Sequence, residues 1–209
     1  MKSNHTIIIT DPHKKILTSL PSNLKNYKIL FAGEWCFGKS YFSKIKKFKI
    51  IPNPFENKKE KKKYFYIVKK NYNFLLIDLT NYLNQIHKVN YSKNYWEQII
   101  GMWLFDFLTI VLEKYLIVKK FKNLPNTSVY KINSKNNLHS DNSRESAKFF
   151  NSHIWNNEIF CFFIKKLKNK IQFKSILVNK NRNILVEKKI SLEKVKIYII
   201  KIFSIITMR

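Results

Sequence analysis

The sequence predicts an α/β fold in which long helices cover a mostly parallel sheet. Two short runs of β-branched and aliphatic residues, at positions 6–10 (TIIIT) and 28–31 (KILF), have the composition of buried strands. Further along the chain, apolar residues recur every three or four positions over long stretches, which is typical of amphipathic helices. Strands separated by such helices need a common sheet that buries both of their faces, which argues against an all-helical bundle.

A turn that contains a glycine follows the second strand. Gly33 leads into Glu34 and Trp35 at the carboxyl end of a strand, where open α/β sheets bind ligands. This placement makes the turn a candidate site. The alternative is that Gly33 only allows a tight connection while Trp35 fills the core beneath it. The first strand ends differently, because Asp11 and Pro12 stop it as turn residues.

The chain has two cysteines, Cys36 and Cys161, among its 209 residues. Two thiols supply neither a disulfide framework nor a zinc site built from cysteine alone, and they favour a reducing compartment. No histidine lies close to Cys36 in the sequence to lower the pKa of its thiol. We therefore interpret Cys36 as a small buried side chain rather than a nucleophile.

Two helical stripes occupy the middle of the chain. Residues 52–63 combine prolines, asparagines and a lysine run, which predicts a solvated loop. A helix is then expected from Asn73, whose side chain is suited to capping, to the neighbourhood of His87. Beyond it the helical spacing of apolar residues continues for more than five turns. A second helix over residues 94–118 is therefore expected to pack across the sheet.

Charged residues argue against a membrane span in this second helix. Its most apolar part, residues 99–118, contains Asp106, Glu113 and Lys114, each of which costs about 2.5–3.5 kcal/mol near a bilayer centre. Asp106 has two interpretations: a buried carboxylate acting as a general base, or a partner for one of the many lysines, which we favour. Gly101 weakens a helix interior, so its presence predicts a physical reason, such as the close approach of another backbone.

The last third of the chain predicts a strand, a helix and a strand in that order. A polar region rich in Asn and Ser contains a short strand candidate at 128–132 (SVYKI). His139 and Asp141 lie close enough for a proton relay, but without a recognisable nucleophile we favour a solvated loop there. A helical stripe over residues 154–167 and a strand at 175–178 follow.

The chain is strongly basic. Lys and Arg number 40 and Asp and Glu number 13, which gives a formal net charge of +27 at pH 7. This charge suits nucleic acid or an anionic membrane surface, but the abundance of Lys, Asn and Ile also matches the codon bias of an A+T-rich genome. Arginine, which grips phosphate by geometry, is scarce, so we expect no specific nucleic-acid partner. A basic RNA-binding or ribosome-associated protein is the alternative function.

Three segments resemble a bacterial family of transferases of surface carbohydrate biosynthesis, whose genes lie in lipopolysaccharide and capsule clusters. The segments are FAGEWC at 31–36, LNQIHKVNYSKNYWEQIIGMWL at 83–104 and IWNNEIF at 154–160. The residues that match the family are Gly33, Glu34, Trp35, Cys36, Leu83, Asn84, His87, Tyr95, Trp96, Gly101, Trp103 and Leu104. Met102 departs from the family, in which proline is more common, so a straight helix is expected here.

The resemblance implies a Rossmann-like fold equivalent to the N-terminal half of a two-domain, glycosyltransferase-like protein. Residues 1–170 correspond to that half, and residues 171–209 to an incomplete or divergent C-terminal segment. In such proteins the nucleotide-sugar donor is expected mainly on the second half. The chain is therefore expected to be a truncated transferase that catalyses no sugar transfer alone, and no further cofactor is implied.

The chemistry that a transferase needs indicates which residues could form its site. A transferase without a metal needs a base for the acceptor hydroxyl, and dipoles or cations for the leaving phosphate. The candidate bases are Glu34, His87 and Asp106. The candidate binding residues are Gly33, Trp35, Asn84, Tyr95 and Trp96. The expected partners are a carbohydrate acceptor and an anionic membrane surface. A cytoplasmic location at the inner membrane is expected, because the first ten residues lack the apolar core of a secretory signal.

Overall fold

A computed structural model describes residues 5–37, 45–121, 124, 126–133, 150, 152–167 and 172–177. The chain divides into two compact units, which are described separately. The sheet unit comprises Met1–Glu56, Glu113–Leu138 and Asn151–Leu185. The hairpin unit comprises Asn57–Leu112, His139–Phe150 and Val186–Arg209.

The described part of the sheet unit contains five strands, all paired in parallel. They are β1 (His5–Ile9), β2 (Tyr27–Phe31), β3 (Lys49–Ile50), β4 (Thr127–Asn133) and β5 (Gln172–Leu177). The strand order is β3-β2-β1-β4-β5, so β1 lies at the centre. The α/β fold with a mostly parallel sheet is therefore confirmed. β5 pairs with β4 in this sheet, so residue 170, the expected end of the N-terminal half, precedes a strand of the same sheet.

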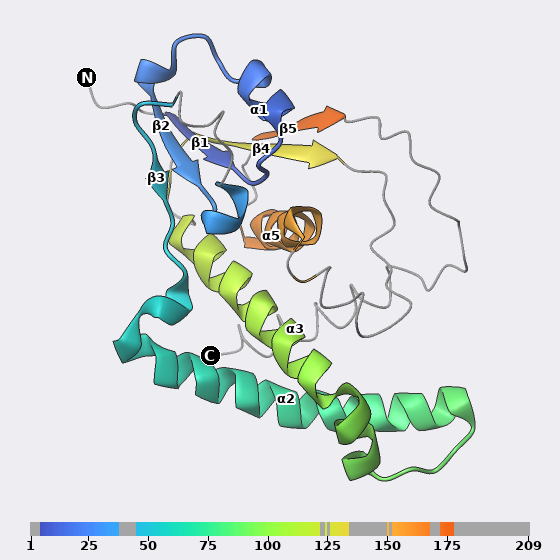
Figure 1. Cartoon of the computed structure of the whole chain (residues 1–209). Coiled ribbons are helices and arrows are strands. Elements are labelled where there is room, and N and C mark those ends of the chain that lie inside the picture. The colour runs from blue at the N-terminus through green and yellow to red at the C-terminus, as the bar shows by residue number, and fades with distance from the viewer. Residues whose placement is uncertain are drawn as a thin grey trace. The chain divides into compact units, whose positions relative to one another are not determined.

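Two helices connect neighbouring strands of the sheet. α1 (Lys14–Ser19) joins β1 to β2, and α5 (His153–Leu167) joins β4 to β5. The two connections run in opposite directions along the sheet. Right-handed crossovers that diverge in this way place their helices on opposite faces, as Figure 1 shows for α1 and α5. Single 3₁₀ turns cover Leu24–Asn26 (η1), Glu34–Cys36 (η2) and Pro54–Glu56 (η4).

The core of the sheet unit is built from the strands predicted by their β-branched runs. Ile7, Ile8 and Ile9 of β1 are all fully buried, as expected for a central strand covered on both faces. On α5, Phe160 and Phe163 are also fully buried. Their rings meet aromatic rings from the last turns of α3 (Lys93–Phe121), namely Phe121 and Tyr115.

The hairpin unit contains α2 (Lys58–His87) and the first part of α3. The prediction of a loop through residue 63 is wrong, because the lysine run from Lys58 is helical. Asn57, and not Asn73, caps this helix: its side chain accepts a hydrogen bond from the backbone N–H of Lys59. Glu60 in the first turn and the good helix propensity of lysine support the early start.

The expected helix over 94–118 is confirmed as part of α3, which begins at Lys93 and continues to Phe121. Only its last turns, from Glu113, belong to the sheet unit. Gly101 lies against Tyr72 of α2, and a Cβ at this position would lie 2.6 Å from the tyrosine Oη. The close neighbour of Gly101 is therefore a tyrosine side chain and not the expected backbone. Among the described helices, none has the length and apolarity that crossing a membrane requires.

Other expected elements are confirmed with small shifts. The strand expected at 128–132 is β4, and the helical stripe over 154–167 is α5. The strand expected at 175–178 is β5, which begins three residues earlier, at Gln172. His139 and Asp141 lie outside the described residues.

Candidate active site at the carboxyl edge of the sheet

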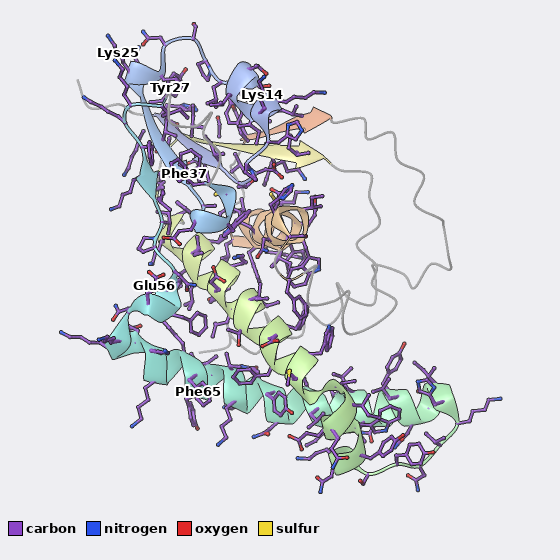
Figure 2. All side chains as sticks on the ribbon, viewed as in Figure 1. Lys14, Lys25, Tyr27, Phe37, Glu56 and Phe65 are labelled. Atoms are coloured by element: carbon purple, nitrogen blue, oxygen red, sulfur yellow. The ribbon has the colours of Figure 1, made fainter. Side chains whose placement is uncertain are left out.

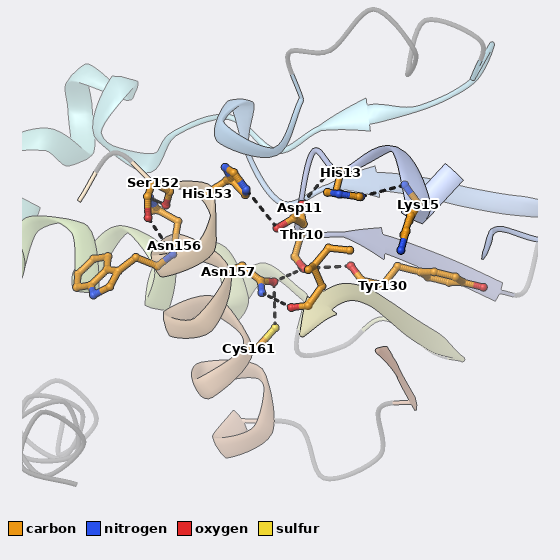
Figure 3. Close-up of polar contacts among 12 residues, drawn as sticks. Thr10, Asp11, His13, Lys15, Tyr130, Ser152, His153, Asn156, Asn157 and Cys161 are labelled. Atoms are coloured by element: carbon orange, nitrogen blue, oxygen red, sulfur yellow. Dashed lines mark hydrogen bonds and ion pairs between the residues drawn. The ribbon is translucent and has the colours of Figure 1, made fainter. Parts of the chain in front are cut away.

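The strand order identifies β1 as the point where the chain connections diverge. From β1 the chain proceeds to β2 on one side, and β4 flanks β1 on the other. In open α/β sheets, ligands bind outside the carboxyl ends of the strands at such a point. Thr10 and Asp11 follow β1 directly. Figure 3 shows the polar side chains that meet them from α5.

Asp11 is a buried carboxylic acid with only 1% of its surface exposed. Its Oδ1 accepts a hydrogen bond of 2.9 Å from the backbone N–H of His13. Its Oδ2 lies 4.0 Å from Nε2 of His153. Burial raises the pKa of Asp11 to about 6, although the His13 hydrogen bond and charge act in the opposite direction. A carboxylate at neutral pH is therefore held out of water at the end of the central strand.

His153 is the solvent-facing partner of this acid. It is the first residue of α5, and 45% of its side-chain surface is exposed. His13 has a different role, since its Nδ1 accepts a hydrogen bond from the backbone N–H of Lys15 and caps α1. The geometry thus separates a buried acid from an exposed imidazole, the division of labour of Asp–His pairs in which the imidazole moves the proton.

A hydrogen-bond network holds α5 against the ends of β1 and β4. The hydroxyl of Thr10 lies 2.5 Å from Oδ1 of Asn157 and 3.1 Å from the carbonyl oxygen of Tyr130. Asn157 Nδ2 donates to the carbonyl of Ile132. Asn157 stands four residues after His153, on the same face of α5, so this network also orients His153 toward Asp11.

The turn after β2 forms a second cluster in the sheet unit. Gly33 is required because a Cβ there would lie 2.6 Å from Nε1 of Trp35. The Trp35 ring has Nζ of Lys114 at 5.0 Å from its centroid and packs near Phe160. Lys114 is 1% exposed and pairs with Glu113 at 2.9 Å. Burial lowers the pKa of Lys114, against the opposing effect of Glu113.

Cys36 closes this turn and has a structural role. Its thiol donates to the carbonyl of Gly33 at 2.9 Å, with the carbonyl of Ile9 at 3.3 Å. Burial raises its pKa to about 12, so the thiolate is not available at neutral pH. The interpretation of Cys36 as a packing residue is confirmed. Burial likewise raises the pKa of Cys161 to about 12.

The turn between α2 and α3 gathers a third set of motif residues. Asn84 Oδ1 accepts hydrogen bonds from the backbone N–H of Tyr91 and from Nε1 of Trp96, while its Nδ2 donates to the carbonyl of Tyr91. His87 stacks on Trp96, with 5.7 Å between ring centroids, and Tyr95 meets Trp96 edge-on. The hydrogen bonds of the Asn84 amide thus hold together the turn that joins α2 to α3.

Replacing Asn84 by Ala is expected to lower the free energy of unfolding by about 2 kcal/mol, because the Trp96 and Tyr91 donors lose their acceptor. Chemical unfolding checks this value. Asn73→Ala, at an exposed position in the same helix, is the matched control and should change stability little. If Asn84→Ala leaves stability unchanged, the structural role assigned to Asn84 is wrong.

The candidate site residues predicted from the sequence do not all belong to the same unit. Gly33, Glu34 and Trp35 lie in the sheet unit, where Glu34 is exposed after β2. Asn84, His87, Tyr95 and Trp96 lie together in the hairpin unit. Asp106 also belongs to the hairpin unit and is exposed, so of its two interpretations the less favoured one, a buried base, does not fit the structure.

Sequence reasoning missed Asp11 and His153. The rule that pointed to Glu34 after the second strand applies equally to Asp11 after the first, but Asp11 was assigned to a turn. Within the described part of the chain, no three His, Cys, Asp or Glu side chains cluster closely enough to hold a metal ion.

Comparison with known proteins gives one finding. A family model described as LIC12162 family transferase matches residues 14–208. No curated protein and no solved structure matches the chain.

Proposed function

Because this chain belongs to the LIC12162 family of transferases, we propose that it contributes the acceptor side of a glycosyl transfer during the biosynthesis of cell-surface carbohydrate, and that it does not complete the transfer alone. The proposed acceptor is a sugar or a lipid-linked saccharide, and the proposed donor is a nucleotide sugar. The observation that supports this proposal most is the buried Asp11 behind the exposed His153 at the carboxyl end of the central strand.

In the proposed reaction, His153 is the base for the acceptor hydroxyl. The oxygen attacks the anomeric carbon of the donor as the bond from that carbon to the leaving phosphate oxygen breaks. The hydroxyl proton passes to the His153 imidazole, and the phosphate leaves with the bonding electrons. The buried Asp11 carboxylate stabilises the imidazolium, because the opposite charge of Asp11 lies 4.0 Å from the His153 Nε2 and is itself shielded from water.

Glu34 is a second candidate site residue at the same carboxyl edge of the sheet. It follows β2, which is paired in parallel with β1, so both residues come after carboxyl ends of adjacent strands. Its exposed carboxylate suits a hydrogen bond to a sugar hydroxyl. We assign it to acceptor binding, and the proton transfer to His153.

Replacing His153 by Asn tests this assignment through binding. Acceptor glycosides and uridine-, guanosine- and cytidine-linked sugars are titrated into isotope-labelled chain and followed by NMR. We expect signals around Asp11 and His153 to shift, and His153→Asn to weaken the affinity at least about tenfold, as for loss of a hydrogen bond to a charged group.

His87→Asn is the matched control, since it removes an exposed imidazole from the hairpin unit. We expect it to bind the same sugar with unchanged affinity. Sugar-induced shifts confined to the Asn84, His87 and Trp96 cluster would place the site in the hairpin unit and contradict the proposal.

A further inference from the structure

The outward face of α2 carries a continuous stripe of lysines and large apolar side chains. Its members follow one another at spacings of four, three, four, four and three residues, which keeps them on one face of a helix. All six are exposed. The α2 stripe consists of Lys59, Lys63, Tyr66, Lys70, Phe74 and Ile77. Figure 2 shows side chains of α2 extending away from α3.

The apolar members of the stripe are unusually open to water. Tyr66 is 64% exposed, and Phe74 and Ile77 are each 53% exposed. Single exposed apolar residues are normal on a protein surface, but three of them aligned between lysines form an organised face. The opposite side of α2 is occupied by packing, where Leu75 and Leu76 are buried. The stripe is therefore not part of the core of the hairpin unit.

All charged residues of the α2 stripe are positively charged lysines. Glu60 and Asp78 are the acidic residues of α2, and neither belongs to the stripe. Each lysine near an anionic lipid surface contributes about 1 kcal/mol of binding free energy. Lysine stems can also lie along apolar surface while their ammonium groups stay at the headgroups.

We propose that the α2 stripe docks the chain on a lipid bilayer that contains anionic headgroups. α2 lies parallel to the surface, with Phe74 and Ile77 at the boundary between headgroups and acyl chains and Tyr66 at headgroup level. Lys59, Lys63 and Lys70 face the lipid phosphates. The proposal is independent of the transfer chemistry, because vesicle binding needs neither donor nor turnover.

The composition of the stripe favours lipid over RNA. RNA-binding surfaces combine basic groups with aromatic rings that stack on bases, and arginine is the preferred cation. The stripe contains no arginine, and Ile77 offers neither stacking nor hydrogen bonds. An exposed isoleucine beside an exposed phenylalanine gains most from an apolar environment.

Vesicle co-sedimentation tests the charged part of the stripe. The intact chain is mixed with phosphatidylcholine vesicles with or without about 30% phosphatidylglycerol. We expect binding to the anionic vesicles alone. Neutralising the three stripe lysines as Lys59→Gln, Lys63→Gln and Lys70→Gln should weaken it by about 100-fold, from about 1 kcal/mol per lysine and 1.4 kcal/mol per factor of ten.

A second triple variant controls for net charge. Lys14→Gln, Lys25→Gln and Lys28→Gln remove the same charge from exposed positions of the sheet unit. We expect this variant to bind the anionic vesicles within a few-fold of the intact chain. Gln has nearly the helix propensity of Lys, and circular dichroism verifies that both triple variants are folded.

The apolar part is tested by Phe74→Ser with Ile77→Ser, which should weaken vesicle binding at physiological salt by about tenfold or more. If the two lysine triple variants lose vesicle affinity equally, the net charge of the chain and not the α2 stripe is responsible for binding, and the proposal is overturned. The proposal is equally overturned if the stripe lysines are needed for binding an RNA oligonucleotide but not for binding vesicles.

Discussion

Replacing Asp11 by Asn is expected to raise the free energy of unfolding at pH 7 by about 2–3 kcal/mol. Burial raises the pKa of Asp11 from 3.8 to about 6, and one pKa unit corresponds to about 1.4 kcal/mol. Asn is nearly isosteric and can still accept the hydrogen bond from the backbone N–H of His13. The variant thus avoids the cost of burying a charge while keeping the local contact.

The direction in which stability changes with pH follows from how many protons the folded and unfolded chains bind. Between about pH 4 and pH 6 the folded chain holds a proton on Asp11 that the unfolded chain has released. The contribution of Asp11 to stability therefore falls as pH rises through this window, and it stays low above the folded pKa. The advantage of Asp11→Asn should be small near pH 4 and complete above about pH 7.

Urea unfolding of both proteins from pH 4 to pH 8 measures this difference. Asp106→Asn is the matched control, because it changes an exposed acid and should leave stability nearly unchanged at every pH. If Asp11→Asn is less stable than the intact chain at pH 7, Asp11 is a stabilising partner rather than a strained functional acid. Increased stability together with weaker sugar binding is the expected signature of an active-site residue.

Replacing Lys114 by Ala is expected to lower the free energy of unfolding by about 3 kcal/mol. The side chain is 1% exposed, so its removal leaves a cavity beside Trp35 and deprives Glu113 of its partner. Lys119→Ala, at an exposed position in the same helix, should change stability little. Chemical unfolding at pH 7 compares the two variants.

Lys114→Met separates packing from charge. Met fills a similar volume without a buried ammonium group, so this variant should be within about 1 kcal/mol of the intact chain, or more stable. Burial lowers the folded pKa of Lys114, so the unfolded chain holds a proton that the folded chain has lost as pH approaches 10.5. The free energy of unfolding of the intact chain should therefore rise relative to that of Lys114→Met as pH rises from the lowered folded pKa of Lys114 to about 10.5. A constant difference between the two proteins at all pH values would contradict the buried position of Lys114.

The sequence was sufficient to predict the central strands and the long helices. Ile7 to Ile9 are branched, consecutive and bounded by turn residues, a combination that a helix rarely shows. The start of α2 was missed because lysines have no hydrophobic period, although they are good helix formers and Asn57 supplies a cap.

The candidate site was harder to predict than the fold. Asp11 and His153 are separated by more than half of the chain, and they meet only because β1 and β4 are neighbours. Sequence periodicity does not reveal strand order. The raised pKa of Asp11 depends equally on burial that several elements provide. By contrast, Asn84 and Trp96 are close in sequence and hydrogen-bond to each other across one local turn. Their contact could therefore be expected from the sequence motif that contains both.

The most direct test of the account is a histidine footprint in the presence of sugar. Diethylpyrocarbonate modifies accessible imidazoles, and both His153 and His87 are exposed. Peptide mass spectrometry then reports, within one sample, which of the two a bound sugar protects. We predict that a nucleotide sugar or acceptor glycoside that binds the chain slows modification of His153 and leaves His87 unchanged. Protection of His87 with no effect on His153 would contradict a site at the carboxyl edge of the sheet.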